Sequence, residues 1–277
     1  MIKIMIDNEI IAVNLTLKRR ETPMKLDRVT AIRTHLFTKG FSSVVEIAEA
    51  FGVSEPTVRR DLMELEAAGV ITRSHGGARI AESSGAEVAF EAREQINLAP
   101  KRAIGAAAWQ MLRPDTAVFL DAGTTVLQLA RRLRLNPVPL RVFTNCLVVA
   151  QLLMPVEALT VTLLGGVIRP QNASMVGTLA EEALERLWFD QLFLGAGAIA
   201  ETGEISSADD QEARLNGRML ARANRVVVLA DADKFGHRLT FRVGRLGPGM
   251  QVVTEARLDA GWQQRLGDWG CDLLGVA

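Results

Sequence analysis

The stretch Val44–Gly77 reads VVEIAEAFGVSEPTVRRDLMELEAAGVITRSHGG, and its pattern predicts two helices joined by a tight turn. Four apolar residues near its start are spaced to share one helical face: Val45, Ile47, Ala48 and Phe51. Gly52 follows them and supplies the backbone freedom that a sharp helix end requires. We therefore expect a first helix that ends at Gly52.

A second helix is predicted just after this glycine. Ser54 is a favourable N-cap, and Pro56 falls in the first turn, where its missing N–H is not needed. Val58, Leu62 and Leu65 repeat at helical spacing and form a stripe that should be buried. Burial of this stripe leaves polar residues exposed at the N-terminal end of the helix: Glu55, Thr57, Arg59 and Arg60.

The flanking sequence adds a third helix and a hairpin. Residues 27–39 carry Val29, Ile32 and Leu36 on one face, while Val70–Arg73 reads as a strand and Gly76-Gly77 as its turn. This arrangement is typical of a winged helix-turn-helix module, which inserts the start of its second helix into the major groove. The predicted DNA contacts are Ser54, Glu55, Pro56, Thr57, Arg59, Arg60, Arg73 and His75.

The charge of this module is nearly balanced. Its basic residues between 24 and 80 are Lys25, Arg28, Arg33, Lys39, Arg59, Arg60, Arg73 and Arg79, and its acidic residues are Asp27, Glu46, Glu49, Glu55, Asp61, Glu64 and Glu66. A module that neutralises few phosphates favours a dimer or tetramer reading repeated half-sites of double-stranded DNA. A helical bundle that recruits protein partners is the alternative.

Length and composition allow a second, larger domain. The chain has 277 residues, 48% of them hydrophobic, and no apolar run long enough for a membrane span, so we expect a cytoplasmic protein. We divide it into an N-terminal extension (1–23), the DNA-binding domain (24–81), a linker (82–89) and an α/β domain (90–277). The basic triplet Lys18-Arg19-Arg20 in the extension could be an arm that contacts phosphates. Alternatively, translation starts at Met24 and the extension is not part of the protein, which is the interpretation we favour.

Neither a metal nor another cofactor is predicted. Cys146 and Cys271 lie far apart without metal-ligand spacing and should be reduced, buried thiols. The histidines at positions 35, 75 and 237 form no zinc pattern.

Beyond residue 90, predicted helices alternate with apolar strands, which indicates an α/β fold with a largely parallel sheet. Ligands of such sheets bind beyond the C-terminal ends of the strands. Asp121-Ala122-Gly123-Thr124-Thr125 joins a predicted strand to a helix, where N–H groups and hydroxyls suit an anion. The same turn also suits a plain helix cap, and it lacks the lysine of a nucleotide-binding P-loop.

Other strand ends carry polar residues and glycines. Thr144-Asn145 ends the next predicted strand, and Gly165-Gly166 with Arg169 ends the following one. Lys234 stands beyond the last, in a chain that uses arginine much more often than lysine. A compact ammonium group is common in phosphate and carboxylate pockets, although a lysine on a surface turn is equally consistent with the composition.

These motifs resemble the DeoR family of bacterial transcriptional regulators. GVS at 52–54, TVRRDL at 57–62, Leu65-Glu66, Gly69 and HGGA at 75–78 match its N-terminal domain. FLDAGTT, Thr144-Asn145, LLGGVIRP, MVGTLAEEAL, DQLFLGA and DADKFG match its C-terminal domain. The resemblance implies a ribose-5-phosphate isomerase-like sensor domain for phosphorylated sugars or related metabolites. The implied effector contacts are Asp121, Gly123, Thr124, Thr125, Asn145, Gly166, Arg169 and Lys234.

Two departures from the family pattern remove charge. Gly195-Ala-Gly-Ala-Ile199 replaces a segment that often holds an aspartate, and Asn216 stands where a lysine is common. Sugar isomerisation needs a placed base and acid, so the departures argue against catalysis, although Asp121, Glu204, Asp209 and Asp210 offer carboxylates. We expect a repressor of a carbohydrate-metabolism operon, not an enzyme, that is tuned by a phosphorylated sugar. An isomerase-like enzyme with a DNA-binding appendage is the alternative.

Overall fold

The structure, a computed structural model, describes residues 2–6, 9–13, 25–39, 41–67, 70–74, 76–80 and 90–277. The chain divides into two compact units, Met1–Ala81 and Glu82–Ala277, which we call the N-terminal and C-terminal units. Each unit is treated by itself. His75, part of the 1–23 extension and the 82–89 linker lie outside the described residues.

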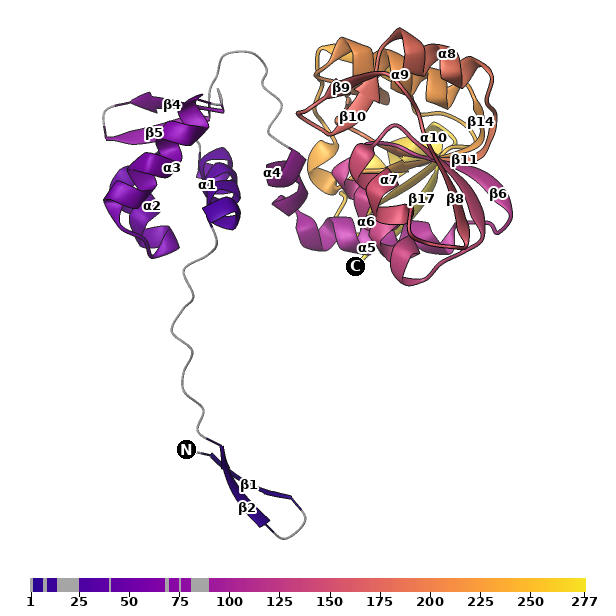
Figure 1. The fold of residues 1–277 in the computed structure, drawn as a ribbon. Helices are drawn as coiled ribbons and strands as arrows, with labels where there is room; N and C mark the ends of the chain where they lie inside the picture. Colours follow the sequence, from indigo (N-terminus) through magenta and orange to yellow (C-terminus); the bar gives the residue numbers. More distant parts are fainter. Residues whose placement is uncertain are drawn as a thin grey trace. The chain divides into compact units, whose positions relative to one another are not determined.

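The N-terminal unit combines helices with short antiparallel strands (Figure 1). Its elements are β1 (Ile2–Ile6), β2 (Glu9–Val13), α1 (Lys25–Lys39), β3 (Phe41–Ser43), α2 (Val44–Phe51), α3 (Glu55–Ala67), β4 (Ile71–Ser74) and β5 (Gly77–Ile80). β5 lies between β3 and β4 in one sheet, and β1 pairs with β2 in another. The three predicted helices are present, and β3 is an element that the sequence pattern did not reveal.

The helix α2 begins at Val44, the first residue of the predicted stretch. Ser43 is its N-cap, in a capping box with Glu46, and Gly52 ends it at a φ of 64°. Val44 is buried, whereas Val45 is 50% exposed, so the predicted inward position of Val45 is wrong. The inward face runs through Val44, Ile47, Ala48 and Phe51, and Val45 lies about 100° around the helix from Val44.

Gly77 belongs to β5, although it was expected in the turn. A Cβ on Gly77 would lie 2.5 Å from the carbonyl oxygen of Ser42 and 2.6 Å from the ring of Phe41. Only glycine therefore lets β3 approach β5 at this point.

A buried ion pair joins α1 to α3. Arg28 donates from Nε to Oδ2 of Asp61 at 2.6 Å and from Nη2 to Oδ1 at 3.1 Å. Both residues are buried, within an apolar core that includes Ile32, Leu62 and Leu65. The two-pronged contact fixes how α3 is held against α1, and with it the face that α3 exposes.

The C-terminal unit alternates strands and helices. Its elements are α4 (Phe90–Gln95), α5 (Leu98–Gln110), β6 (Thr116–Leu120), α6 (Thr124–Leu135), β7 (Leu140–Thr144), α7 (Leu147–Leu153), β8 (Leu159–Leu163), β9 (Val167–Arg169), β10 (Ser174–Val176), α8 (Thr178–Glu185), β11 (Phe189–Gly195), β12 (Ala198–Ile199), β13 (Glu204–Ser207), α9 (Asp210–Leu220), β14 (Ala223–Leu229), the 3-10 helix η1 (Ala232–Lys234), β15 (Phe241–Arg245), β16 (Gln251–Glu255), α10 (Ala260–Asp268) and β17 (Asp272–Val276).

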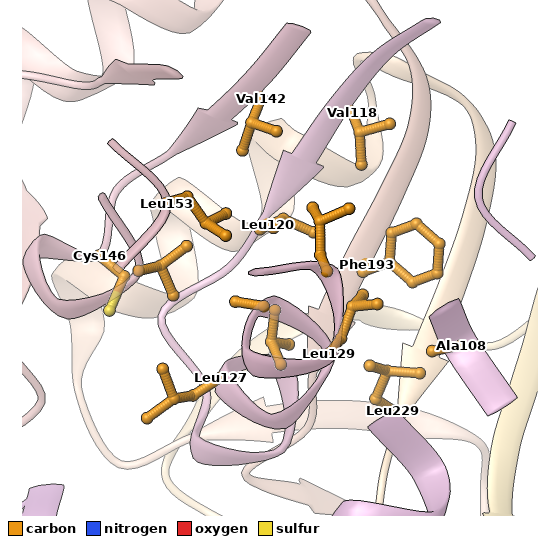
Figure 2. Packing of buried hydrophobic residues seen from close by; sticks show 14 of the residues in the cluster. Ala108, Val118, Leu120, Leu127, Leu129, Val142, Cys146, Leu153, Phe193 and Leu229 are labelled. Carbon is orange, nitrogen blue, oxygen red and sulfur yellow. The ribbon is translucent and has the colours of Figure 1, made fainter. Parts of the chain in front are cut away.

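A seven-stranded parallel sheet, in the order β17-β16-β14-β11-β6-β7-β8, forms the middle layer (Figure 1). The predicted α/β fold class is thereby confirmed. Successive residues of a strand point to opposite faces of the sheet and pack in two separate cores. Val118 and Leu120 lie in one core, and Phe119 lies in the other. Helices α5, α6 and α7 cover the first face, which Figure 2 shows around Leu127 and Leu129, and α8, α9 and α10 cover the second.

Several short elements escaped the sequence patterns. They are the β9–β10 hairpin, the small antiparallel sheet β12-β13-β15, and α4, β16, α10 and β17. Strands of two to five residues offer too few positions for alternation to show.

The strand order places a topological switch point between β6 and β11. From β6 the chain proceeds to β7 and β8 on one side, and it later returns to β11 on the other side of β6. In open sheets of this kind, ligands bind in a crevice beyond the C-terminal ends of the strands at such a point. Asp121 follows β6 and Gly195 ends β11, so both lie where that crevice is expected.

Replacing Asp61 tests the ion pair to Arg28. In Asp61→Ala the guanidinium stays buried without its carboxylate, and we expect the N-terminal unit to lose about 3–5 kcal/mol of stability. Hydrogen exchange of the α1 and α3 amides in the full chain measures this loss. Glu49→Ala, which removes an exposed carboxylate from α2, is the control. Equal protection in the two variants would contradict the role given to the pair.

Candidate functional site

The exposed N-terminal end of α3 carries six of the predicted DNA contacts. We call this surface the recognition face, and its residues are Ser54, Glu55, Pro56, Thr57, Arg59 and Arg60. Burial of Val58 and Leu62 on the opposite side of the helix turns these residues outward. The recognition face therefore has the orientation that a groove-reading helix needs.

Ion pairs partly neutralise the arginines of the predicted DNA contacts. Arg59 pairs with Glu55 at 3.2 Å, one helical turn earlier, and both side chains are about half exposed. Arg73 on β4 lies 3.8 Å from Glu66. Such exposed pairs are worth at most about 1 kcal/mol, so a phosphate or a base edge competes with them readily. His75, the remaining predicted contact, lies outside the described residues.

Asp121 lies at the switch point with its carboxylate buried. Oδ2 accepts a hydrogen bond from the backbone N–H of Gly195 at 3.1 Å. Burial raises the pKa of Asp121 to about 6, although the N–H groups of Ala122, Gly195 and Gly123 and the charge of Arg93 act in the opposite direction. The ionised form is therefore held at a cost, which is common at ligand sites.

Glycines on both sides of this carboxylate let the two loops come close together. A Cβ on Gly195 would lie 3.3 Å from Oδ2 of Asp121 and 3.3 Å from the Cα of Gly123. A Cβ on Gly123 would in turn lie 3.3 Å from the Cα of Gly195. Both contacts are tighter than most Cβ contacts, so a side chain at either position would push the two loops apart by a few tenths of an ångström.

The helix α6 starts at the switch point without a side-chain cap. Gly123 is its N-cap, and its first-turn residues Thr124 and Thr125 are buried. In contrast, Asp209 caps α9 and Asp259 caps α10. The first-turn N–H groups of α6 therefore remain for an anion, which the helix dipole also favours.

Asn145 occupies the equivalent place at the end of β7. It is 1% exposed, and its Nδ2 donates to the carbonyl of Met175 at 3.3 Å. The neighbouring hydroxyl of Thr144 donates to the carbonyl of Leu120 at 2.6 Å, which ties β7 to β6. Asn145 is thus held beside the end of β6.

A group of cations gathers at the same edge of the sheet. Lys101 is buried and its Nζ donates to the carbonyl of Arg93 at 2.6 Å. Burial lowers the pKa of Lys101 to about 8, Asp231 acts to raise it, and Lys234 and Arg93 lower it further. We call Arg93, Lys101 and Lys234 the cation cluster. The charge of Arg93 also acts on Asp121, which links the cluster to the switch point.

Sequence reasoning predicted Lys234 but not Arg93 or Lys101. Both lie on helices that precede β6, where no strand end marks them as site residues. The available signal was composition, since Lys101 and Lys234 are the lysines that occur after residue 90.

Gly166 and Arg169 have structural roles near the β9–β10 hairpin. Gly166 has a φ of 146°, and a Cβ there would lie 2.6 Å from the carbonyl oxygen of Val176. Arg169 pairs with Glu212 at 3.0 Å and with Asp209 at 3.5 Å. Their part in effector binding stays a prediction, because these contacts already engage the guanidinium of Arg169.

The carboxylates considered for acid–base chemistry are engaged elsewhere. Asp209 accepts from the N–H of Glu212 as the cap of α9, Glu204 pairs with Arg238 at 2.8 Å, and Asp210 pairs with Arg214 at 3.3 Å. None of these contacts brings a base and an acid together at Asp121. The arrangement therefore suits binding better than isomerisation.

A cavity of about 310 Å³ lies beside the ends of β16 and β17. Its lining consists of Ala99, Pro100, Ala103, Glu255, Ala256, Arg257, Val276 and Ala277. None of the predicted effector contacts belongs to it.

Within the described part of the chain, no cluster of His, Cys, Asp and Glu side chains is arranged to hold a metal ion. Cys146 and Cys271 are buried free thiols, and burial raises the pKa of Cys146 to about 11. No described helix has the length and apolar character to cross a membrane.

Comparison with known proteins identifies both units. Residues 28–84 match the DeoR-like helix-turn-helix domain, and residues 96–256 match the DeoR C-terminal sensor domain. The chain belongs to the DeoR family. It is therefore a DNA-binding transcription regulator, which confirms the predicted family and the interpretation of the chain as a regulator rather than an enzyme.

Relatives match along most of the chain. The HTH-type transcriptional regulator GlpR of Haloferax volcanii is 36% identical over 85% of this chain and 92% of its own length. The lactose phosphotransferase system repressor of Streptococcus mutans is 34% identical over 76% and 84%. The glycerol-3-phosphate regulon repressor of Escherichia coli is 30% identical over 79% and 86%.

Among solved structures, ribose 5-phosphate isomerase A of Methanocaldococcus jannaschii aligns with a TM-score of 0.37 and 18% identity, over 50% of this chain and 55% of that one. At this distance the similarity carries no argument about activity.

The raised pKa of Asp121 predicts a gain in stability when its charge is removed. A carboxyl that binds protons more tightly folded than unfolded destabilises the fold as the pH rises from 3.8 through about 6. Asp121→Asn should raise the free energy of unfolding at pH 7.5 by about 1–3 kcal/mol, and the gain should shrink below pH 6. Thermal unfolding of both proteins between pH 4.5 and 7.5 measures this. A less stable Asp121→Asn at pH 7.5 would show that the ionised carboxylate stabilises the fold.

Proposed function

We propose that this regulator is a cytoplasmic homo-oligomer that represses a carbohydrate-metabolism operon and leaves its operator when a phosphorylated sugar binds the C-terminal unit. The observation that carries the effector assignment is the uncapped N-terminus of α6 at the switch point, where the charge of Arg93, a member of the cation cluster, acts on Asp121. Both features favour a phosphate group. The names of two relatives point the same way, since one is a lactose phosphotransferase system repressor and another a glycerol-3-phosphate regulon repressor.

DNA contact is assigned to the recognition face together with Arg73 and His75. Because the net charge around this surface is close to zero, the N-terminal unit of one protein copy neutralises few phosphates. Two or four copies on repeated half-sites supply the remaining affinity.

The helix α4 is the proposed route between effector and output. It follows residues 82–89, and it is held by Phe90 in the core, by Glu94 paired with Arg131 at 2.6 Å, and by Lys101 on the Arg93 carbonyl. A phosphate that draws the Lys101 ammonium group toward itself weakens this last contact. The ligand thereby favours one position of α4 over another, and operator affinity changes with it.

Titration of the operator complex with sugar phosphates tests the proposal. Gel-shift assays on the DNA upstream of the regulated genes, with a panel of aldose, ketose and polyol phosphates, should show release by at least one of them. Unchanged operator binding with every compound would rule out the phosphosugar effector while leaving DNA binding in place.

The recognition face is tested by the double variant Arg59→Ala/Arg60→Ala. Loss of two guanidinium groups that suit guanine edges or phosphates should weaken operator binding by at least about tenfold. Arg134→Ala, an exposed arginine at the end of α6, should leave operator affinity unchanged. Effector binding should survive in all variants. An unaltered operator affinity in the double variant would instead support the alternative of a protein-recruiting bundle.

The cation cluster predicts a pH-dependent anion affinity. Since the pKa of Lys101 is lowered to about 8, its ammonium form is lost as the pH rises through that value. Sulfate keeps a constant charge over this range, so its affinity by calorimetry should fall between pH 7 and pH 9. Lys101→Met should abolish that fall and weaken binding at pH 7, whereas Lys39→Met should behave as wild type. A pH-independent affinity in the wild type would remove Lys101 from the site.

A further inference from the structure

Two buried residues with oxygen acceptors, Asp121 and Asn145, occupy corresponding positions just beyond the ends of neighbouring strands. In the register of β6 and β7, Leu120 is opposite Thr144, so Asp121 and Asn145 occupy the next position along the two strands. Neighbouring strands run about 4.8 Å apart. Asp121 is 2% exposed and Asn145 is 1% exposed.

Each side chain makes one well-formed hydrogen bond, which leaves its second oxygen or its amide oxygen without one, although the N–H groups of Ala122 and Gly123 also act on the Asp121 carboxylate. Gly195 N–H fixes Oδ2 of Asp121, and the Met175 carbonyl fixes Nδ2 of Asn145. Across the described residues, no donor makes a hydrogen bond to Oδ1 of either side chain. We call these two atoms the acceptor pair. Buried polar atoms of this kind are rare and destabilise a fold, so they call for a physical explanation.

The two acceptors do not satisfy each other at neutral pH. The amide oxygen of Asn145 only accepts hydrogen bonds, and an ionised carboxylate has no proton to donate. Because the pKa of Asp121 is about 6, the carboxyl is mostly ionised at pH 7.5. The donors that suit the acceptor pair are therefore supplied either by ordered water or by a bound ligand whose hydroxyls take its place.

The place of the acceptor pair points to the effector. Asp121 comes three residues before Thr124, where α6 begins without a side-chain cap. The positive charge of Arg93 also acts on Asp121. Thr254 also has a buried hydroxyl without a hydrogen bond among the described residues, but it stands on β16, with β14 and β11 between it and β6. Thr254 thus provides a matched control away from the crevice.

We propose that the acceptor pair selects the effector by its hydroxyl groups, with two neighbouring hydroxyls of a sugar or polyol chain donating to Asp121 Oδ1 and Asn145 Oδ1. This inference rests on the proposed function, in which the phosphate of the same molecule binds the cation cluster and the start of α6. It also narrows the effector class. A carboxylate group at this position would meet the carboxylate of Asp121, so sugar phosphates are favoured over phosphorylated sugar acids.

Calorimetry on the full chain at pH 7.5 tests the inference with inorganic phosphate, ribose 5-phosphate, glucose 6-phosphate, fructose 1-phosphate and glycerol 3-phosphate as probes. The tightest organic phosphate should bind at least about tenfold more tightly than inorganic phosphate. Asn145→Ala and Asp121→Asn should each lose about tenfold of that affinity, because an acceptor is removed or replaced by an amide donor. Inorganic phosphate should bind both variants at least as tightly as wild type, and Thr254→Val should match wild type with every probe.

The outcomes separate this inference from the function on which it rests. Organic phosphates that bind no more tightly than inorganic phosphate, or that lose nothing in Asp121→Asn, would overturn hydroxyl selection and leave the anion site standing. A loss in Thr254→Val equal to that in Asn145→Ala would also overturn it, since the effect would then be a general one on the core. Failure of every probe to bind would overturn the proposed function itself. Asp121→Asn keeps the test decisive even where Asn145→Ala does not fold, because its effect on stability is expected to be favourable.

Discussion

The hydrogen bond from Gly195 to the buried carboxylate of Asp121 joins the two strands between which the chain reverses its direction across the sheet. The close approach of the two loops is eased by glycine at 123 and 195, and the start of α6 has no side-chain cap beside it. Burying a carboxylate here opposes folding, and its pKa shows that opposition. A residue that weakens the fold while lying at the ligand edge of a parallel sheet is best explained by binding.

Around this point, the proposed site combines two kinds of group. Arg93, Lys101 and Lys234 supply positive charge, while Asp121 and Asn145 supply acceptors on neighbouring strand ends. Phosphate and hydroxyl groups on one small molecule would match both. Lys101 also holds α4 through the Arg93 carbonyl, so in this proposal the residue that attracts the ligand also fixes the helix following residues 82–89. In the N-terminal unit, the Arg28–Asp61 ion pair fixes the position of α3 against α1.

The amino-acid pattern was sufficient for the parts of the fold that rest on local periodicity. The stripe of Val58, Leu62 and Leu65 predicted α3 and its outward face, and the apolar runs after residue 90 predicted a parallel sheet. The turn at Asp121–Thr125 was recognisable because glycine and hydroxyl residues between a strand and a helix have a specific use. Arg93 and Lys101 were not recognisable as site residues, since their nearness to Asp121 depends on tertiary packing. Likewise, the engagement of Arg169 by Glu212 and Asp209 joins segments far apart in sequence. Val45 was misplaced because two valines stand side by side, and the apolar spacing alone did not show that Val44 is the one that faces the core.

Thermodynamic linkage tests the central claim, which is that a small molecule bound at the switch point controls the affinity of the protein for its operator DNA. Operator affinity is measured with and without the tightest sugar phosphate, and the affinity for that sugar phosphate is measured with and without operator DNA. Because the coupling is reciprocal, the two affinities should fall by the same factor, typically about 5-fold to 150-fold. A sugar phosphate that binds equally well to the free and the operator-bound protein would contradict the account.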